Sequence, residues 1–396
     1  MAKGYKIGNI LGIDIRLDWS WLLIFVLVTW NLGATFGEYH GDWSLFLQWG
    51  LAVTAAVLFF SSVLAHELAH SLVARSRGIP VRNIKLHLFG GVSNIQRDPD
   101  SPQGEFLMAI VGPLTSLALG FLLLIGAGVS SQPLETVRQP AEAISRLQPV
   151  PMMLIWLGSV NVILGVFNLI PGFPLDGGRV LRSLLWSLMD DLRRATRWAS
   201  RVGQSFAWLM IFGGVSMAFG YRIPFFGSGV ASGLWLIFIG WFLNSASAQS
   251  YQKVVVQDIL EDVSVKRMMR KDPPTVSSGV TIDSLVHEHV MGTDDHAFPV
   301  LDDDRLVGIV TLDDVRGVSR EAWSQTLARE IMTPRKDLTT VKADSGADEA
   351  MNKLSVVDVR LLPVVRGQEL VGVLRRRDII RWLQLESEAA KGGVGI

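Results

Sequence analysis

The sequence contains no cysteine. Disulfide bonds and thiolate metal sites are therefore excluded, and any bound metal ion must be held by histidine, aspartate or glutamate. Charge is also scarce, because only 19% of the 396 residues are Asp, Glu, Lys or Arg, against about 25% in an ordinary soluble domain. The 37 basic residues balance the 37 acidic ones, so nothing in the overall charge points to a nucleic-acid partner.

Long apolar runs take the place of the missing charge, since 49% of the residues are hydrophobic. A helix needs roughly 20 residues to cross a bilayer. No small-residue cleavage pattern follows the first run, so we interpret it as a membrane span and not as a signal peptide. Six spans are predicted, of which the last two are short: about 19–34, 43–74, 103–129, 152–170, 206–219 and 230–243. A polar stretch at 245–252 separates them from a charged C-terminal tail.

Basic residues are distributed unevenly among the links between these spans. Five Lys or Arg residues lie in 75–102 and six in 171–205, whereas the link 35–42 has none. Because basic residues concentrate on the cytoplasmic side of a membrane, we expect both termini to be cytoplasmic. The protein is then a multi-pass α-helical protein of the cytoplasmic membrane, in contact with the lipid bilayer.

Two short stretches have the pattern of strands. Residues 13–17 alternate apolar and charged side chains, and residues 84–95 have a strand-turn-strand pattern around Gly90 and Gly91. Open sheet edges are not tolerated against lipid. The hairpin is therefore expected at the cytoplasmic interface or inside a protein-lined cavity.

The motif His66-Glu67-Leu68-Ala69-His70 lies within the second predicted span. Two histidines four residues apart lie on one face of a helix and can bind a single zinc ion. Glu67 lies beside them, where a carboxylate can take a proton from a water whose pKa the zinc lowers to about 7. Ionisable groups inside a membrane span are rare and usually functional, which favours a metal site over ordinary surface residues.

A catalytic zinc ion usually has three protein ligands and one open position. His40 lies in an outer link, near the wrong face of the membrane. His87, in the predicted hairpin, is a possible ligand, but a lone strand histidine is more often structural. Asp176 follows the helix-breaking segment Pro-Gly-Phe-Pro, so the chain can turn there and direct a carboxylate inward. The other interpretation of Asp176 is a cap for a helix that starts at about residue 179. Spacing alone leaves both interpretations open.

Residues 66–70 and 168–177 together resemble the site-2 protease family of intramembrane metalloproteases. In that family an H-E-x-x-H helix meets a downstream N-x-x-P…L-D-G segment, which this chain has from Asn168 to Gly177. The resemblance implies that His66, His70 and Asp176 bind one zinc ion and that Glu67 is the general base. It also implies that Asn168 helps to position the substrate or the developing oxyanion, although an asparagine in a bundle can simply join helices by hydrogen bonds. The implied substrates are transmembrane proteins.

The tail repeats itself with an offset of 64 residues, so that Phe298-Pro299-Val300 aligns with Leu362-Pro363-Val364. This repeat resembles a tandem pair of CBS domains, which are soluble β-α-β-β-α units. The predicted domains are a transmembrane metalloprotease domain at 1–248, a first CBS domain at 253–318 and a second at 325–388.

Tandem CBS pairs often bind adenine nucleotides through a Thr or Ser followed three residues later by Asp. The first repeat has Thr311 and Asp314, whereas the second has Arg375 in place of the hydroxyl and keeps Asp378. The resemblance therefore implies one site for ATP, ADP or AMP. The alternative is that the aspartates only cap helices and that the pair is a structural or homodimer-forming module.

Two other functions compete with an intramembrane protease. A membrane transporter or channel regulated by a CBS pair would need polar residues along a pathway through several spans, whereas here they concentrate at Glu67 and Asp176. An inactive, protease-like binding protein is disfavoured because the complete set of ligand-type residues is present.

Overall fold

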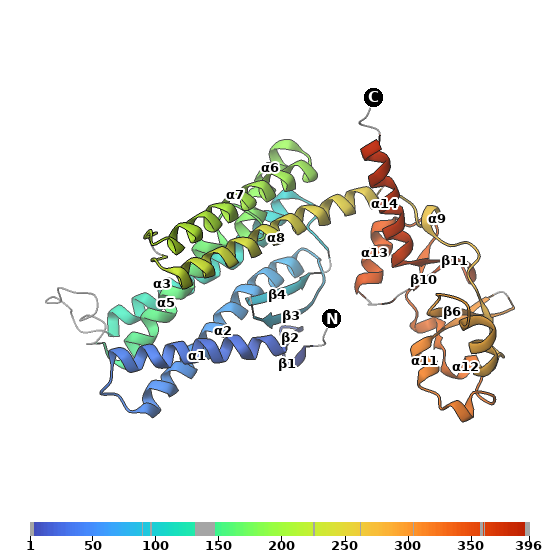
Figure 1. Ribbon diagram of the computed structural model, residues 1–396, viewed down its shortest axis with the longest axis horizontal. Helices are drawn as coiled ribbons and strands as arrows, with labels where there is room; N and C mark the ends of the chain where they lie inside the picture. Colours follow the sequence, from blue (N-terminus) through green and yellow to red (C-terminus); the bar gives the residue numbers. More distant parts are fainter. Residues whose placement is uncertain are drawn as a thin grey trace. The chain divides into compact units, whose positions relative to one another are not determined.

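The computed structural model describes residues 4–88, 90–95, 97–130, 147–224, 226–261, 263–303, 305–356, 359 and 361–392. The chain divides into two compact units, Met1–Gln252 and Lys253–Ile396. The described helices that begin in the first unit are α1 Trp19–Tyr39, α2 Leu45–Ser76, α3 Pro102–Ser130, α5 Pro149–Asn168, α6 Asp176–Met189, α7 Leu192–Ala218 and α8 Val230–Glu261 (Figure 1).

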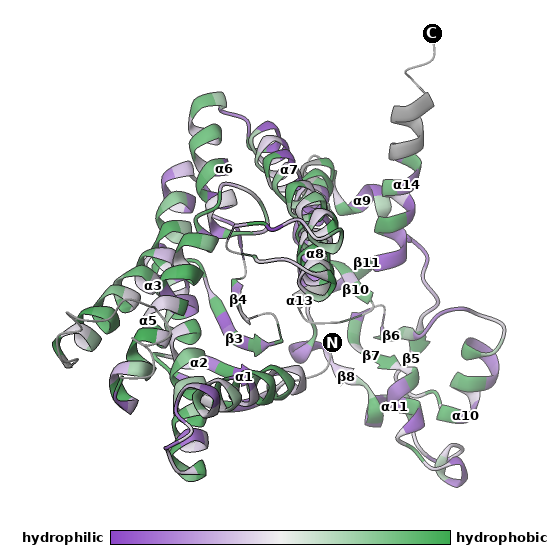
Figure 2. Ribbon diagram, turned by 60° about the vertical axis from the view of Figure 1, so that its left-hand side comes forward, coloured by the Kyte–Doolittle hydropathy of each residue, from purple (hydrophilic) through white to green (hydrophobic). Residues whose placement is uncertain are grey.

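Within the described residues, five helices are long and apolar enough to span a membrane: α1, α2, α3, α5 and α8. Figure 2 shows the hydrophobic colour along these helices. Their apolar side chains remain exposed on the protein surface, as Trp30 and Phe121 do, which is expected where lipid replaces water around the helices. The multi-pass helical fold class predicted from the sequence is therefore confirmed.

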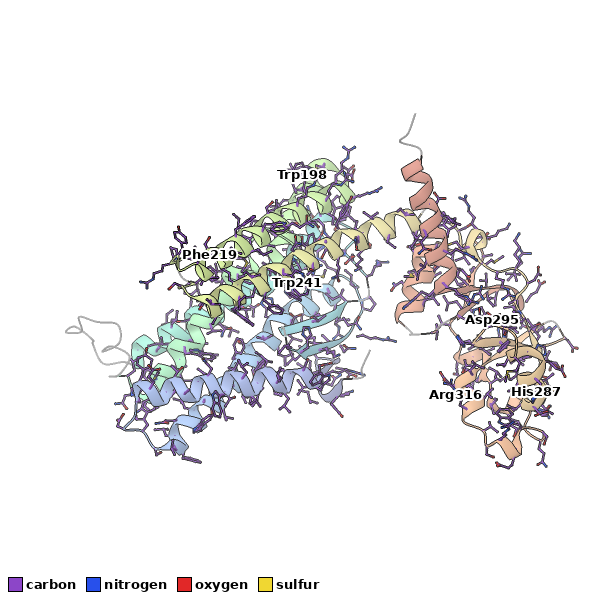
Figure 3. All side chains as sticks on the ribbon, in the orientation of Figure 1. Trp198, Phe219, Trp241, His287, Asp295 and Arg316 are labelled. Atoms are coloured by element: carbon purple, nitrogen blue, oxygen red, sulfur yellow. The ribbon has the colours of Figure 1, made fainter. Side chains whose placement is uncertain are left out.

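The ends of three helices differ from the predicted ones. Helix α7 begins at Leu192, well before the predicted fifth span, and its first part carries four arginines, with Trp198 near its start (Figure 3). It is not among the five apolar helices, so the count of six spans stays a prediction. Helix α8 continues through the polar stretch 245–252, and α6 begins at Asp176 and not at about residue 179.

A four-stranded sheet lies beside α2 (Figure 1). Its order is β1-β2-β3-β4, with β2 and β3 parallel and the other two pairs antiparallel. The strands are β1 Tyr5–Ile10, β2 Ile13–Leu17, β3 Val81–His87 and β4 Gly90–Ile95. Ile13, Ile15 and Ile84 are buried against Leu64 and Leu68 of α2. This packing holds the sheet against the turns of α2 that carry the histidine motif, with β4 at an edge of the sheet.

The second unit contains a seven-stranded sheet of order β5-β6-β7-β11-β10-β9, with β8 paired to β7. Its strands are β5 Val276–Ser277, β6 Ala297–Asp302, β7 Arg305–Thr311, β8 Thr333–Pro334, β9 Val341–Lys342, β10 Leu361–Arg366 and β11 Glu369–Arg375. Strands β6 and β7 are displaced by 64 residues from β10 and β11. The repeat seen in the sequence is thus a repeat of structure, with β7 and β11 meeting at the centre of the sheet.

The described helices that follow α8 are α9 Val265–Met268, α10 Ile282–Ser284, η1 Leu285–Val290, α11 Leu312–Arg316, η2 Arg320–Ala322, α12 Ala328–Ile331, η3 Arg335–Asp337, α13 Ala347–Val356 and α14 Arg376–Gly392. Each repeat has its own apolar core. Phe298 and Val310 lie in the first, and Leu362 and Leu374, at equivalent positions, lie in the second. The α/β tail predicted from the sequence is therefore confirmed.

Candidate metal centre

Two histidines from α2 and one aspartate from α6 converge on a point inside the first unit. His66 Nε2 lies 3.1 Å from Asp176 Oδ2, His70 Nε2 lies 3.2 Å from the same oxygen, and the two Nε2 atoms lie 3.2 Å apart. Both histidines are buried, and the Asp176 side chain is only 16% exposed. The structure thus brings together three ligand-type residues whose carboxylate lies more than 100 positions from either histidine.

This triangle of atoms has the size that a zinc site requires. A tetrahedral zinc ion with ligand distances of about 2.0–2.1 Å separates its ligand atoms by roughly 3.3 Å. The observed separations of 3.1–3.2 Å are close to that value. The donors are two imidazoles and one carboxylate, which suit zinc in a chain without thiolates. Three protein ligands also leave a fourth position for water or substrate.

The far nitrogen of each ring is held by α3. His70 Nδ1 lies 2.6 Å from the carbonyl oxygen of Met108, so this nitrogen carries the proton and Nε2 presents a lone pair. His66 Nδ1 lies 2.9 Å from Ser116 Oγ. Partners of this kind orient metal-binding histidines and select their tautomer. Helix α3 therefore orients both rings so that their Nε2 atoms face Asp176.

Gly112 brings the backbone of α3 directly against the two rings. A Cβ atom at this position would lie 2.2 Å from His70 Nε2 and 2.7 Å from His66 Nε2. Any side chain there would collide with the Nε2 atoms of both histidines. The absence of a side chain at residue 112 is thus a condition for the triangle to form.

The side chain of Glu67 extends from α2 to the edge strand β4. Its carboxylate Oε2 accepts a hydrogen bond of 2.7 Å from Ser93 Oγ, and Ser71 lies 3.1 Å from Ser93. A Cβ atom on Gly91 would lie 2.4 Å from Glu67 Cγ. Strand β4 therefore fixes the direction of the Glu67 side chain by one hydrogen bond and one close backbone contact.

A buried ion pair connects α3 with α6, the helix that carries Asp176. Arg182 Nε donates a hydrogen bond of 2.7 Å to Glu105 Oε1, and both residues are buried. The Arg182 guanidinium also lies 5.2 Å from the centre of the Phe173 ring, in the segment just before α6. Removing one partner of a buried pair leaves an uncompensated charge and costs about 3–5 kcal/mol. The pair thus holds the first turns of α6 in place against α3.

The other residues considered as ligands or site residues lie elsewhere. The Asn168 amide donates to the carbonyl of Leu164 in its own helix, so the structure shows it bonded to α5 and not to the triangle. His40 is buried in the link between α1 and α2, where its ring stacks on Trp43 at 3.9 Å. His87 ends β3 and is not part of the group that includes Asp176. Asn161 likewise donates to the carbonyl of Leu157 in its own helix, and this bond does not join two helices.

Several contributors to the site were not found in the sequence. A backbone carbonyl such as that of Met108 leaves no signal in a sequence. A signal did exist on α3, where Glu105, Gly112 and Ser116 recur at helical spacing along one face of an otherwise apolar run. Ser71 likewise follows Glu67 by four residues on α2.

Among the described residues of the second unit, two of the cavities share part of their lining. One has a volume of about 560 Å³ and a wall formed by Arg375, Arg376 and Arg377. The other, of about 250 Å³, has Thr311 on a largely apolar wall that includes Ile309. The residues common to both are His296, Ala297, Asp313, Val359 and Leu361. Together the cavities form one cleft, called here the tail cleft, with a basic end and an apolar end.

The four predicted nucleotide-binding residues divide into two pairs. Thr311 and Asp314 form a capping box at the start of α11, in which the Asp314 carboxylate accepts hydrogen bonds from the Thr311 amide and hydroxyl. Arg375 donates to both carboxylate oxygens of Asp378. Thr311 and Arg375 line the tail cleft, whereas Asp314 and Asp378 are absent from the described lining.

Comparison with known proteins gives matches over almost the whole chain. The family profile described as Peptidase family M50 matches residues 54–210, and the CBS domain profile matches residues 265–321 and 328–385. A relative named zinc metalloprotease Rip3, from Mycobacterium tuberculosis, is 32% identical over 97% of this chain and 94% of its own length. The zinc metalloprotease sll0528 of Synechocystis is 34% identical over 97% of this chain and 96% of its own.

The solved structure of a site-2 protease from Methanocaldococcus jannaschii is 28% identical in sequence and covers 63% of this chain and 95% of that chain, with a TM-score of 0.41. The class of protein is a membrane metalloprotease that carries a CBS pair. The chain belongs to peptidase family M50. The family resemblance and the enzyme class predicted from the sequence are confirmed, and the transporter is disfavoured.

Proposed function

We propose that the protein is a zinc-dependent endopeptidase that cleaves peptide bonds in or near the transmembrane segments of other membrane proteins. One observation carries this proposal. The triangle of His66, His70 and Asp176 is buried among helices that are long and apolar enough to span a membrane. A hydrolytic site inside such a bundle acts where soluble substrates do not reach.

Each site residue has a separate role in the proposed reaction. His66, His70 and Asp176 hold the metal ion, which when bound supplies a Lewis acid for the scissile carbonyl and lowers the pKa of a water to about 7. Glu67 removes a proton from the attacking water and later donates it to the nitrogen of the leaving amine. Ser93 restricts the rotation of the Glu67 carboxylate. Asn168 is retained as a candidate for substrate contact, which requires release of its bond to Leu164.

We propose further that the substrate adds to β4 as an extra strand. A peptide bond inside a helix is hydrogen-bonded within its own segment, so the substrate must unwind before it is cut. Among the described strands, β4 pairs only with β3, so its other edge is open for strand addition beside Glu67.

Proline at Val92 should slow cleavage, because it removes a backbone donor from the edge strand. Val92→Ala keeps that donor and is the matched control. Helix-breaking residues placed near the scissile bond of the substrate should speed cleavage. The assay uses purified protease in lipid vesicles with a single-span reporter, and mass spectrometry locates the cut. A cut confined to the soluble part of the reporter, or equal rates for the two Val92 variants, would contradict strand addition at β4.

The orientation follows from the distribution of basic residues, and we propose a location in the cytoplasmic membrane with both termini in the cytoplasm. The absence of cysteine allows single-cysteine mapping without further changes. In intact cells, an impermeant maleimide should label Asp42→Cys and spare Asp100→Cys. The reverse labelling pattern would overturn the orientation.

The tail cleft supports a second proposal, that the CBS pair binds one adenine nucleotide. Its basic end at Arg375 suits a phosphate, and its apolar end beside Thr311 suits a base and sugar. Asp314 and Asp378 would then act through the residues that they hold, Thr311 and Arg375.

Calorimetry on the full chain in detergent, with ATP, ADP and AMP, tests this proposal. Binding should saturate at one nucleotide per chain, and Asp314→Ala should weaken it by disordering Thr311. Any effect of the nucleotide on cleavage should be graded, because a ligand shifts an equilibrium only by its differential affinity for two states. If no nucleotide binds at millimolar concentration, the remaining interpretation is that the CBS pair is a dimerisation module. A measurement of the molecular mass in solution would then detect the dimer.

A further inference from the structure

Three arginines converge on the single carboxylate of Asp295 in the second unit. Arg270 Nη1 lies 2.8 Å from Oδ2, while Arg375 Nη1 and Arg377 Nη2 lie 2.7 Å and 2.9 Å from Oδ1. The Asp295 side chain is 10% exposed, but those of Arg270 and Arg377 are 41% and 51% exposed. Asp295, labelled in Figure 3, lies in the wall of the tail cleft beside Arg375 and Arg377.

The three arginines that contact Asp295 carry more positive charge than this one carboxylate can neutralise. Arg375 has a second partner in Asp378, but Asp295 is the only recorded carboxylate partner of Arg270 and Arg377 among the described residues. Burial alone raises the pKa of Asp295, yet the hydrogen bond from Arg270 and the charge of Arg375 hold that pKa below its ordinary value. The carboxylate is therefore ionised at neutral pH, and it is outnumbered by guanidinium groups.

The donors around Asp295 match a phosphate group better than a carboxylate. Guanidinium groups present forked N–H donors that suit the oxygens of a phosphate. A phosphate offers three oxygens and up to two negative charges, whereas the carboxylate offers two oxygens and one charge. Arg375 and Arg377 already line the cavity of about 560 Å³, so a ligand can reach them.

We propose that the Asp295 carboxylate is an internal substitute for a ligand phosphate. It occupies the place among the three arginines where that phosphate would bind, and a phosphate-bearing ligand must displace it. This inference rests on the proposed nucleotide site, because it assigns to Asp295 the regulation of ligand binding there. Displacement costs the interactions of Asp295 and lowers the apparent affinity. The tail then responds only to ligand concentrations well above those that the arginines alone would require.

The test is calorimetric titration of the full chain in detergent with pyrophosphate, and then with AMP and ATP. Asp295→Asn should tighten pyrophosphate binding by about tenfold or more, because the arginines are released. Asp313→Asn is the matched control. Asp313 lines the same cavity and carries the same charge, but its recorded partner is Arg316. This control should change the affinity by less than about threefold.

A loss of pyrophosphate affinity in Asp295→Asn would overturn the proposal. An equal gain in Asp295→Asn and Asp313→Asn would also overturn it, because such a gain reflects only the total charge of the cleft. Adding Arg377→Gln to Asp295→Asn should cancel the gain, and a gain that survives it would also count against the proposal. If Asp295→Asn binds pyrophosphate more tightly but neither AMP nor ATP binds, the role of Asp295 is supported and the proposal of a nucleotide site is contradicted. If AMP binds to the wild type and Asp295→Asn shows no gain in affinity, the nucleotide site is supported and the role of Asp295 is contradicted.

Discussion

Replacing Glu67 by glutamine should lower the rate of peptide hydrolysis by roughly 10²–10⁴-fold, the usual contribution of a general base. The amide has the shape of the carboxylate and its oxygen can still accept the hydrogen bond from Ser93. It cannot remove a proton from water. Because Glu67 is outside the triangle of ligand-type atoms, zinc content should stay at about one ion per chain.

Turnover of a single-span reporter and zinc content by mass spectrometry are the two measurements for Glu67→Gln. Glu38→Gln, near the end of α1, is the control and should change neither. If the Glu67 variant keeps its zinc and still cleaves at the rate of the wild type, Glu67 has no part in proton transfer. If it loses its zinc, the residue acts on the metal and not on the water.

Replacing Asp176 by alanine should empty the metal site. Two histidines would remain, and an open site with two ligands holds zinc poorly. Because loss of an outer partner alone costs about 10–100-fold in metal affinity, loss of this ligand should cost more than about 100-fold. Cleavage should fall in parallel and should return in part at high zinc concentration.

His87→Ala and His40→Ala are the controls for Asp176→Ala, because both histidines were candidates from the sequence and neither lies in the triangle. Both variants should retain about one zinc ion per chain. An empty site in His87→Ala, together with full occupancy in Asp176→Ala, would transfer the third ligand to the hairpin. Circular dichroism of each variant separates metal loss from unfolding.

The meeting of His66, His70 and Asp176 in the structure follows from features that the sequence displays. The four-residue spacing of His66 and His70 fixes a common helix face, and the breakers before Asp176 end α5 so that α6 can start with an inward carboxylate. The roles of these residues in binding zinc stay predictions. The supports on α3 were missed, since Met108 acts through its backbone and Ser116 is unremarkable in a membrane helix.

Prediction of the fold failed mainly at ends and edges. Hydropathy indicates which residues can lie in a membrane and not where a helix ends. The predicted sixth span therefore ended with the last apolar residues, whereas Ser, Ala and Gln allow α8 to continue to Glu261. Strand β1 was missed because Gly8 and Asn9 are poor strand formers, and its pairing with β2 includes an irregularity at Gly8. In the tail, the 64-residue repeat predicted the strands, but no repeat marks Asp295.

The separation of the three proposed ligands along the chain has a consequence for biosynthesis. His66 and Asp176 are 110 residues apart, so both histidines are synthesised and inserted long before the carboxylate. Closing so long a loop costs conformational entropy, and a metal ion that bridges its ends repays part of that cost only after α6 has packed on α3. Until α6 is made, the new chain therefore lacks one of its three proposed ligands. Under the proposed function, it can act on other membrane proteins only when its own bundle is assembled.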